Sequence, residues 1–367
     1  MSGRVIVVGS VNIDLVARVP HLPHPGETVT GGSYDRHHGG KGGNQAVAAA
    51  RLRRPTLFIG ALGDDTFEVE ARRALQAERV DVSMVASLPG QPTGVALILF
   101  DAAGENQIVV ISGANGAIEA GYARECLGRL GGLTGDVVLV CNEVPLHVVR
   151  ETLTCAHAAG ATTVLNPAPA TGIGRSVFAL ADIITPNRSE LSMLLQTEAR
   201  QTGRRTDASG EIPVRARQLI EPGPDGPGVR KAVIVTLGAS GVLVLERIGS
   251  GLEGTAASKG KTSAEAETAG PATETIATGE AIAASAAGPD AHGVRIWEVP
   301  AERVATIDST GAGDAFNGAL AAAIAEGRSL AEAVRRAVAA GALATTHVGA
   351  REGMPTALEL EEFLAAR

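Results

Sequence analysis

Short apolar runs alternate along the chain with alanine-rich stretches, and this alternation predicts most of the secondary structure. The runs end in Gly, Asn or Asp, as in RVIVVGSV, TLFIGAL, DVVLVCNE, TTVLNPAP, DIITPN and KAVIVTLG. Short buried strands that alternate with helices are typical of βαβ units, in which helices cover both faces of a mainly parallel sheet. The pattern predicts a three-layer α/β/α, Rossmann-like fold in one domain spanning residues 1–367.

A second pattern interrupts the first and predicts a small accessory sheet. The stretch TGVALILFDAAGENQIVVISG contains two alternating runs joined by a turn-rich DAAGEN, which is the signature of a β-hairpin. Together with the extended, Gly- and Pro-rich stretch from Arg18 to Tyr34, it predicts a small antiparallel sheet that projects from the main domain. We expect this sheet to act as a lid formed by residues of about 12–36 and 93–115.

Two segments have the composition of insertions. The smaller covers about residues 197–230 and becomes Pro/Gly-rich, whereas residues 249–293 are almost entirely Gly, Ala, Ser, Thr and Glu. A stretch of that composition buries too little apolar surface to offset its ordering entropy, so we predict a disordered surface loop that closes at VRIWEVPA, where a strand resumes. A regulatory or docking segment is the alternative interpretation.

Composition excludes several classes of function. The chain has 367 residues, 45% of them hydrophobic and 2% aromatic, with a formal net charge of −8 and a pI near 5.6. An acidic chain with few aromatic residues argues against nucleic acid and membrane partners. The N-terminus MSGRVIVVGSVNIDL fits neither a secretory signal nor a spanning segment, so a cytoplasmic location is expected. The cysteines lack a C-x-x-C pair and the histidines lack metal spacing, so neither set predicts a disulfide framework or a zinc site.

Polar residues follow the predicted strands where a ligand site is expected. In a parallel α/β sheet, ligands bind beyond the carboxyl ends of the strands. Those ends carry Asn12, Asp14, Asn142, Glu143, Asn166, Asn187 and Thr236. Asn12, Asp14 and Glu143 offer a carboxamide and acceptors that suit a polyol, although each alone is also typical of a turn or cap.

The stretch GGKGGNQAVAAARL from Gly39 predicts a glycine turn that leads into a helix opened by Asn44. Glycines let backbone N–H groups approach an oxygen-rich ligand closely, and a helix N-terminus is electropositive. The stretch is not a P-loop, because Asp35 occupies the position of the first glycine and Gly42 follows Lys41. No G-x-G-x-x-G follows the first strand, so a dinucleotide site is not predicted, and the turn could be purely structural.

The stretch DSTGAGDAFNGAL from Asp308 predicts the stronger phosphate site. The N–H groups of Gly311, Ala312 and Gly313 can converge at a helix N-terminus to form an anion hole. Asp314 then lies beside the bound anion. It is either a helix cap or a base that accepts a hydroxyl proton during phosphoryl transfer, and only the second role accounts for the whole motif.

Two further stretches suit a nucleotide and its metal. TPNRSE places Asn187 and Glu190 three positions apart beyond a buried strand, where both can reach the water shell of Mg²⁺. A helix-starting Asn with an acidic first turn is the structural alternative. TLGASGVLV reads as a strand, a tight turn and a second strand, and its Thr236 and Gly238 can contact nucleotide phosphate.

Taken together, these motifs resemble the PfkB family of carbohydrate kinases, and its ribokinases in particular. GGKGGNQAVAAARL is similar to the first family signature and DSTGAGDAFNGAL to the second. The likeness also includes VNIDLV, PGETV, TGVALI, ISGANG, NPAPA, TPN and TLGASGV, so it covers nearly the whole chain except the two insertions. It implies a ribokinase-like fold with a β-sheet lid.

The resemblance implies a set of site residues. It implies that Asp314 is the catalytic base, that Gly311, Ala312 and Gly313 form the anion hole, and that ATP contacts Asn187, Thr236 and Gly238. The implied sugar contacts are Asn12, Asp14, Gly40, Lys41, Asn44, Glu143 and Asp314. Glu190 is implied to hold Mg²⁺ through water, and Asp308, Thr310 and Gly349 to hold a monovalent cation, usually K⁺.

The activity implied by the resemblance is ATP-dependent phosphorylation of D-ribose at O5, by a homodimer joined through its lids. The alternatives are a family kinase acting on deoxyribose, fructose, adenosine or a keto-deoxy sugar acid, and a sugar-binding regulator without catalysis. A nucleoside would favour an apolar or aromatic lid, which so few aromatic residues hardly supply. A regulator would be expected to lack Asp314 or the anion hole, and both are present.

Overall fold

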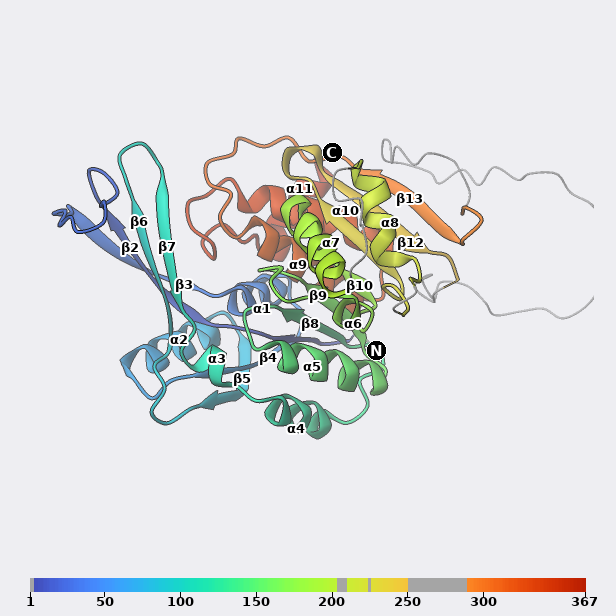
Figure 1. Cartoon of the computed structure of the whole chain (residues 1–367), viewed down its shortest axis with the longest axis horizontal. Coiled ribbons are helices and arrows are strands. Elements are labelled where there is room, and N and C mark those ends of the chain that lie inside the picture. Colours follow the sequence, from blue (N-terminus) through green and yellow to red (C-terminus); the bar gives the residue numbers. More distant parts are fainter. Residues whose placement is uncertain (1–2, 203–209, 224–225, 250–288) are drawn as a thin grey trace, which may run out of the picture.

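The computed structural model describes residues 3–202, 210–223, 226–249 and 289–367, and these ranges form a large central sheet covered by helices (Figure 1). The nine strands of this sheet lie in the order β13-β12-β11-β10-β9-β8-β1-β4-β5. The pairs from β11 through to β5 are parallel, and β12 and β13 are antiparallel additions at one edge. The strands are β1 (Val5–Val8), β4 (Thr56–Leu62), β5 (Val80–Ser87), β8 (Val137–Cys141), β9 (Thr162–Asn166), β10 (Ile183–Ile184), β11 (Ala232–Thr236), β12 (Val242–Arg247) and β13 (Val294–Val299).

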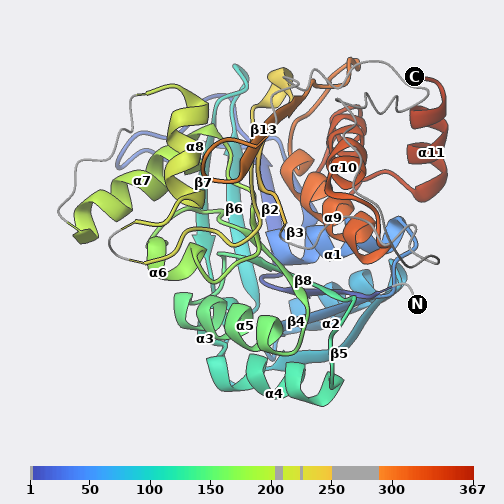
Figure 2. The same ribbon diagram turned by 90° about the vertical axis from the view of Figure 1, so that its right-hand side faces the viewer.

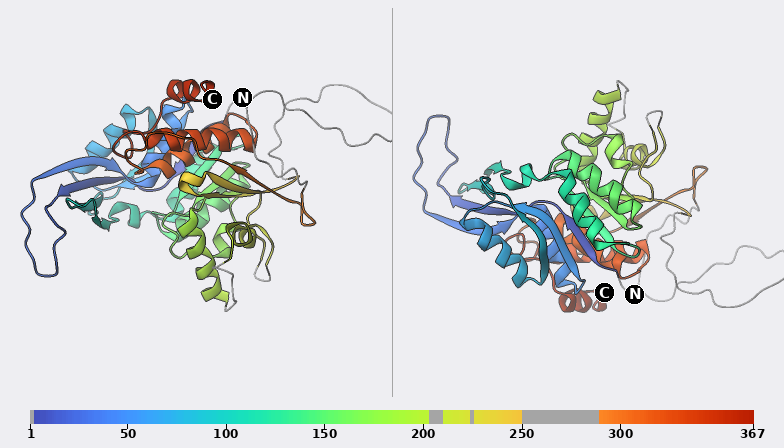
Figure 3. Two further views of the ribbon diagram at one scale, coloured as in Figure 1. Left: turned by 90° about the horizontal axis from the view of Figure 1, so that it is seen from above. Right: turned by 90° about the horizontal axis from the view of Figure 1, so that it is seen from below.

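Side chains of the central strands alternate between two apolar layers. In β1, Val5 and Val7 pack into one layer, whereas Ile6 and Val8 pack into the other. The first layer lies under α1 (Lys41–Arg51), α2 (Thr66–Ala77), α9 (Ala312–Ala325), α10 (Leu330–Ala344) and α11 (Ala357–Ala365). The second lies under α3 (Ala114–Ala117), α4 (Ala120–Leu130), α5 (Leu146–Ala158), α6 (Arg175–Phe178), α7 (Arg188–Thr202) and α8 (Ile212–Ile220). Figures 2 and 3 show helices on both faces of the sheet, which confirms the three-layer α/β/α prediction.

A second, four-stranded sheet projects from the main body at one end (Figure 1). Its order is β3 (Ser33–Gly39), β2 (Asn12–Arg18), β6 (Gly94–Phe100) and β7 (Asn106–Ile111). The prediction of a wholly antiparallel sheet is wrong, because the central pair β2 and β6 is parallel, with Asn12 opposite Gly94. Both strands leave the main body outward, and β3 and β7 return antiparallel to them.

Of the two predicted insertions, the longer lies mostly outside the described residues and the shorter lies mostly within them. Most of the longer one, residues 250–288, lies outside them. On either side of it, β12 and β13 pair antiparallel, with Arg247 opposite Val294. The range 197–230 includes the end of α7 and all of α8, whose Ala216, Leu219 and Ile220 are fully buried against the sheet.

The described ranges bear on two features of the chain, membrane-spanning helices and disulfide bonds. There, no helix is both long and apolar enough to cross a membrane. Cys126, Cys141 and Cys155 are free thiols.

Candidate active site

The site is built around Asp314, in the first turn of α9. Gly311 caps this helix with φ = 76°, and an added Cβ there would lie 2.8 Å from the Ala350 Cα, so glycine is required. The carboxylate of Asp314 makes no capping hydrogen bond. It accepts instead from Asn44 Nδ2 and Gln45 Nε2, each at 3.0 Å. The helix-cap interpretation is therefore wrong, and the carboxylate faces α1.

The glycine stretch that precedes Asn44 forms the first turn of α1. The helix begins at Lys41, three residues earlier than predicted, because Asn44 N–H already donates to the Gly40 carbonyl at 3.0 Å. Gly40 has φ = 82°, and an added Cβ would lie 2.7 Å from the Asn12 nitrogen. This close approach places the start of α1 directly against the first residue of β2.

Close helix packing brings the two motifs together. Gly318 of α9 lies against α1, where an added Cβ would stand 2.5 Å from Ala48 Cβ and 2.6 Å from the Gln45 carbonyl oxygen. The absence of a side chain at Gly318 lets the two backbones approach closely enough for both amides of α1 to reach Asp314. Gln45 Nε2 also donates to Asn166 Oδ1 at the end of β9, at 3.0 Å.

Buried charges surround Asp314. Burial raises the pKa of Asp314, and the ammonium of Lys41 and the two amide hydrogen bonds act against that rise. Reciprocally, Asp314 is the main cause of the raised pKa of Lys41. The result is a desolvated carboxylate that accepts a proton more readily than a surface aspartate and has a cation beside it.

Glu143 closes a second side of the site. Its Oε2 accepts the backbone N–H of Lys41 at 2.9 Å and the hydroxyl of Ser10. Asn12 is fixed by Asn115, whose Nδ2 donates to Asn12 Oδ1 at 2.8 Å. Two of the three residues predicted to suit a polyol are thus held in place, Glu143 just beyond β8 and Asn12 at the start of β2.

Asp14 lies in β2 beside a buried arginine. An added Cβ at Gly39 would stand 2.2 Å from Asp14 Oδ2, so the carboxylate packs directly on that glycine. Burial raises the pKa of Asp14 to about 6, with Arg351 opposing the rise. Arg351 donates to Asn44 Oδ1 and the Gly39 carbonyl, both at 3.0 Å, while its buried Nη1 has no hydrogen-bond partner within the described ranges.

The predicted nucleotide residues lie together. Asn187 and Glu190 form a reciprocal pair in which each backbone N–H donates to the other side chain at 2.8 Å, so the helix-start interpretation of TPNRSE is structurally correct. Thr236 and Asn187 form an isolated parallel β-bridge, and Gly238 lies in the turn that follows, with φ = 61°. Burial raises the pKa of Glu190, and Lys41 and Asp314 also act on it, so this carboxyl faces the site.

The residues predicted for a monovalent cation also converge. Asp308 Oδ1 accepts from Thr310 N–H at 2.9 Å, and Oδ2 accepts from Gly349 N–H at 2.9 Å. Although burial opposes the change, these hydrogen bonds lower the pKa of Asp308. Nowhere in the described ranges do three or more His, Cys, Asp or Glu side chains gather as a metal cluster.

Sequence reasoning missed several residues that shape the site. Gln45 is next to Asn44, which was predicted, and Ser10 follows the first strand. The position of each in the sequence could therefore have indicated it. No motif or strand end near Arg351 in the sequence indicates that it belongs to the site. Conversely, Asn142 ends a predicted strand but donates to the carbonyls of Pro169 and Thr171 and pins that loop instead.

Comparison with known proteins identifies relatives over the full length of the chain. The model of the pfkB family carbohydrate kinases matches residues 2–286 and 256–357. A ribokinase of Haemophilus influenzae is 33% identical over 364 residues, covering 99% of both chains. A deoxyribokinase of Salmonella typhi is 28% identical over 365 residues, covering 98% of both chains. The structure of Arabidopsis thaliana ribokinase complexed with ribose and ATP superposes with a TM-score of 0.73 at 25% identity, covering 99% of both chains.

Proposed function

Because the chain belongs to the pfkB family of carbohydrate kinases, we propose that it transfers the γ-phosphoryl group of ATP to the 5-hydroxyl of D-ribose. The products would be ribose 5-phosphate and ADP. The observation that carries the proposal is the position of Asp314, a buried carboxylate held by two amides in the first turn of a helix. The similarity to ribokinases supports ribose as the acceptor.

Asp314 is proposed to accept the proton of the attacking hydroxyl. A desolvated carboxylate with a raised pKa is a better base than an exposed one. Because the amides of Asn44 and Gln45 each hold one oxygen, the carboxylate is oriented before the sugar arrives. Proton removal makes the hydroxyl oxygen nucleophilic as it bonds to phosphorus and the bond to the β–γ bridging oxygen breaks.

The acceptor sugar is proposed to bind between the small sheet and the start of α1. Asn12, Asp14 and Glu143 supply hydrogen-bond acceptors, while Asn44 and Lys41 supply donors. Gly40 has no side chain, so the sugar can approach its backbone closely. Polar groups that are fixed before binding discriminate well between sugars that differ by one hydroxyl.

The residues present suit a nucleotide and its metal. Gly311, Ala312 and Gly313 are proposed to bind the transferring phosphate, and an added Cβ at Gly313 would meet no atom within 4 Å, so this turn is open. Asn187, Thr236 and Gly238 are proposed to contact ATP, and Glu190 to hold Mg²⁺ through water. Mg²⁺, when bound, neutralises the charge that develops on the phosphates. Asp308, Thr310 and Gly349 are proposed to hold K⁺.

Deoxyribose is the second candidate substrate, because a deoxyribokinase is similar over the whole chain. The two sugars differ only in the 2-hydroxyl, so the discriminating quantity is the ratio of kcat/KM values. Fructose, adenosine and keto-deoxy sugar acids complete the set of acceptors that the family resemblance leaves open.

The experiment that tests the proposal is ADP release by the purified protein with each of these five acceptors, with Mg²⁺ and with or without K⁺. Turnover that is fastest on ribose and rises with K⁺ would support both the substrate and the cation site. Fastest turnover on another acceptor would replace ribose and keep the kinase mechanism. Sugar binding without ADP release would contradict catalysis and indicate a regulator.

We also propose a homodimer in which the small sheets pair. The strand β7 is exposed along its whole length, including Ile108, Val109, Val110 and Ile111, and Leu97 of β6 is exposed opposite Val109. Apolar side chains on an edge strand favour association, and a second copy of the same sheet would cover them.

A further inference from the structure

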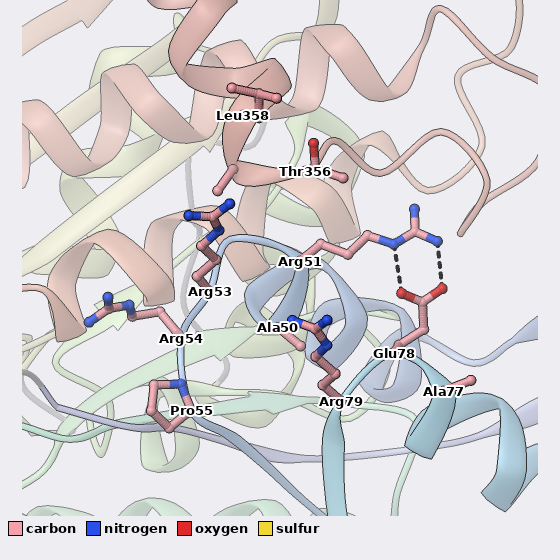
Figure 4. A pocket seen from close by; sticks show the side chains of 11 residues that line it. Ala50, Arg51, Arg53, Arg54, Pro55, Ala77, Glu78, Arg79, Thr356 and Leu358 are labelled. Atoms are coloured by element: carbon pink, nitrogen blue, oxygen red, sulfur yellow. Dashed lines mark hydrogen bonds and ion pairs between the residues drawn. The ribbon is translucent and has the colours of Figure 1, made fainter.

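A pocket of about 910 Å³ lies at the end of α1 opposite to the candidate active site (Figure 4). Its walls come from the end of α1, the connection from α1 to β4, the connection from α2 to β5, and the start of α11. The lining side chains are Ala50, Arg51, Arg53, Arg54, Pro55, Ala77, Glu78, Arg79, Thr356, Ala357 and Leu358. Since α1 has 11 residues, about 15 Å of helix separates this pocket from Lys41.

This pocket, which we term the arginine pocket, is strongly positive. Four arginines and one glutamate line it, so its formal charge is 4 − 1 = +3, although the whole chain carries −8. Figure 4 shows the guanidinium groups of Arg51, Arg53, Arg54 and Arg79 around the same space. A cluster of cations in a pocket attracts small anions and raises their local concentration, even on an acidic protein.

Two of these cations are not neutralised. Arg51 forms a two-bond pair with Glu78 at 2.9 and 2.6 Å, and Arg54 lies 3.5 Å from Glu326. In contrast, Arg53 and Arg79 are exposed, and no ion pair links either of them to another described residue. The exposed guanidinium groups of Arg53 and Arg79 are thus available to a ligand.

The backbone gives an independent observation. Arg53 and Arg79 have φ of 61° and 63°, and they are the two non-glycine residues with positive φ in the described ranges. Each follows the last turn of a helix, at a position where glycine is normally preferred because it lacks a Cβ. The chain therefore carries arginine, at a conformational cost, at two separate helix ends that face one pocket.

We propose that the arginine pocket binds a small oligophosphate anion, either a polyphosphate chain of the nucleotide type or a sugar bisphosphate. Planar guanidinium groups bind phosphate oxygens through two parallel hydrogen bonds, which suits a ligand with two or more phosphates. The volume falls within the range of small-molecule sites. The proposed ligand is distinct from the ATP of the candidate active site, because the pocket lies at the opposite end of α1.

The test compares three forms of the full-length protein in 150 mM KCl: the wild type, the double variant Arg53→Gly and Arg79→Gly, and the control double variant Arg73→Ala and Arg335→Ala. Glycine suits both positive φ values, so the first variant is expected to fold at least as stably as the wild type. Arg73 and Arg335 are exposed and outside the arginine pocket, so the control removes the same charge elsewhere. Melting temperatures verify folding.

Binding is measured by calorimetry and located by hydrogen–deuterium exchange, with inorganic tripolyphosphate and fructose 1,6-bisphosphate as probes. We expect protection of residues 51–55 and 77–80 by at least one probe, a loss of affinity of tenfold or more in the glycine variant, and no more than a twofold loss in the control. The tighter probe identifies the ligand type. Protection confined to residues 308–314, an equal loss in both variants, or no protection by either probe would overturn the proposal.

Discussion

At the scale of single residues, the proposed proton transfer depends on how Asp314 is held. Two neutral amides donate to its oxygens, and a lysine acts on it through space, so the carboxylate is oriented without a direct ion pair within the described residues. An amide hydrogen bond leaves the carboxylate able to accept a proton, whereas a tight ion pair would lower its pKa and weaken it as a base.

The variant Asp314→Asn tests this role. Asparagine has a similar shape but accepts no proton, so we expect kcat to fall by about a thousandfold or more while the Kd for the sugar changes by less than tenfold. ADP release and sugar calorimetry measure the two quantities. Activity near that of the wild type would show that another group is the base.

Asp14 yields a prediction with a defined pH window. Its pKa of about 6 in the fold is above its ordinary value of 3.8, so the folded state binds a proton more tightly than the unfolded state. Stability from this group is complete below about pH 4 and is lost as the pH rises through 6.

We therefore expect Asp14→Asn to increase the free energy of unfolding by about 1 to 3 kcal/mol at pH 7 and to have little effect at pH 4. The same variant should weaken sugar binding, because a charged acceptor is lost. Chemical denaturation at the two pH values measures the first effect, and sugar calorimetry measures the second. An equal change in unfolding free energy at both pH values would show that titration of Asp14 is not the cause.

The sequence predicted which motifs would meet around Asp314 better than it predicted the hydrogen bonds between them. Lys41, Asn44 and Asp314 belong to two motifs whose composition already indicates an anion. Arg351 lies 307 positions from Asn44, and only the folded chain brings them into hydrogen-bond contact. Such long-range partners follow from packing and leave no local pattern.

At the scale of elements, the contact between α1 and α9 determines the geometry of the site. We expect Gly318→Ala to reduce the free energy of unfolding by about 1 to 3 kcal/mol, because a Cβ there would lie 2.5 Å from Ala48 Cβ and force the helices apart. Separation of the helices should also lengthen the hydrogen bonds to Asp314 and lower kcat.

The matched control is Gly128→Ala in α4, where an added Cβ meets no atom within 4 Å. Alanine is the better helix former, so this variant should be neutral or more stable by up to about 1 kcal/mol. Thermal melting and ADP release of both variants measure the difference. If the two behave alike, the tight contact at Gly318 does not matter for the site.

Elements were predicted well where a local pattern determines them. The buried strands and alanine-rich helices follow from apolar periodicity. The parallel pairing of β2 with β6 could not be predicted, because these strands are far apart in the chain and their direction depends on where each leaves the central sheet. The start of α1 was placed late because Lys41, Gly42 and Gly43, a lysine and two glycines, have no pattern typical of a helix.

At the scale of the whole molecule, the exposed small sheet predicts the oligomeric state. We expect the double variant Leu97→Lys and Val109→Lys to convert the proposed dimer into a monomer, because these side chains are paired on one exposed face and charge there opposes association. Light scattering over a range of concentrations measures the mass. A wild-type protein that is monomeric at all concentrations would contradict the dimer.

The antiparallel pairing of β12 with β13 has a consequence for the architecture of the chain. The ladder continues beyond both strands, since Ile248 N–H donates to the Gly293 carbonyl at 2.9 Å. The connection therefore starts and ends at adjacent points of a sheet edge, and the entropic cost of closing a loop between such points grows slowly with loop length. This sheet edge is therefore a suitable site for inserting a sensor peptide or a whole domain. The connection can equally be shortened to a tight hairpin turn without changing the central sheet and its helices.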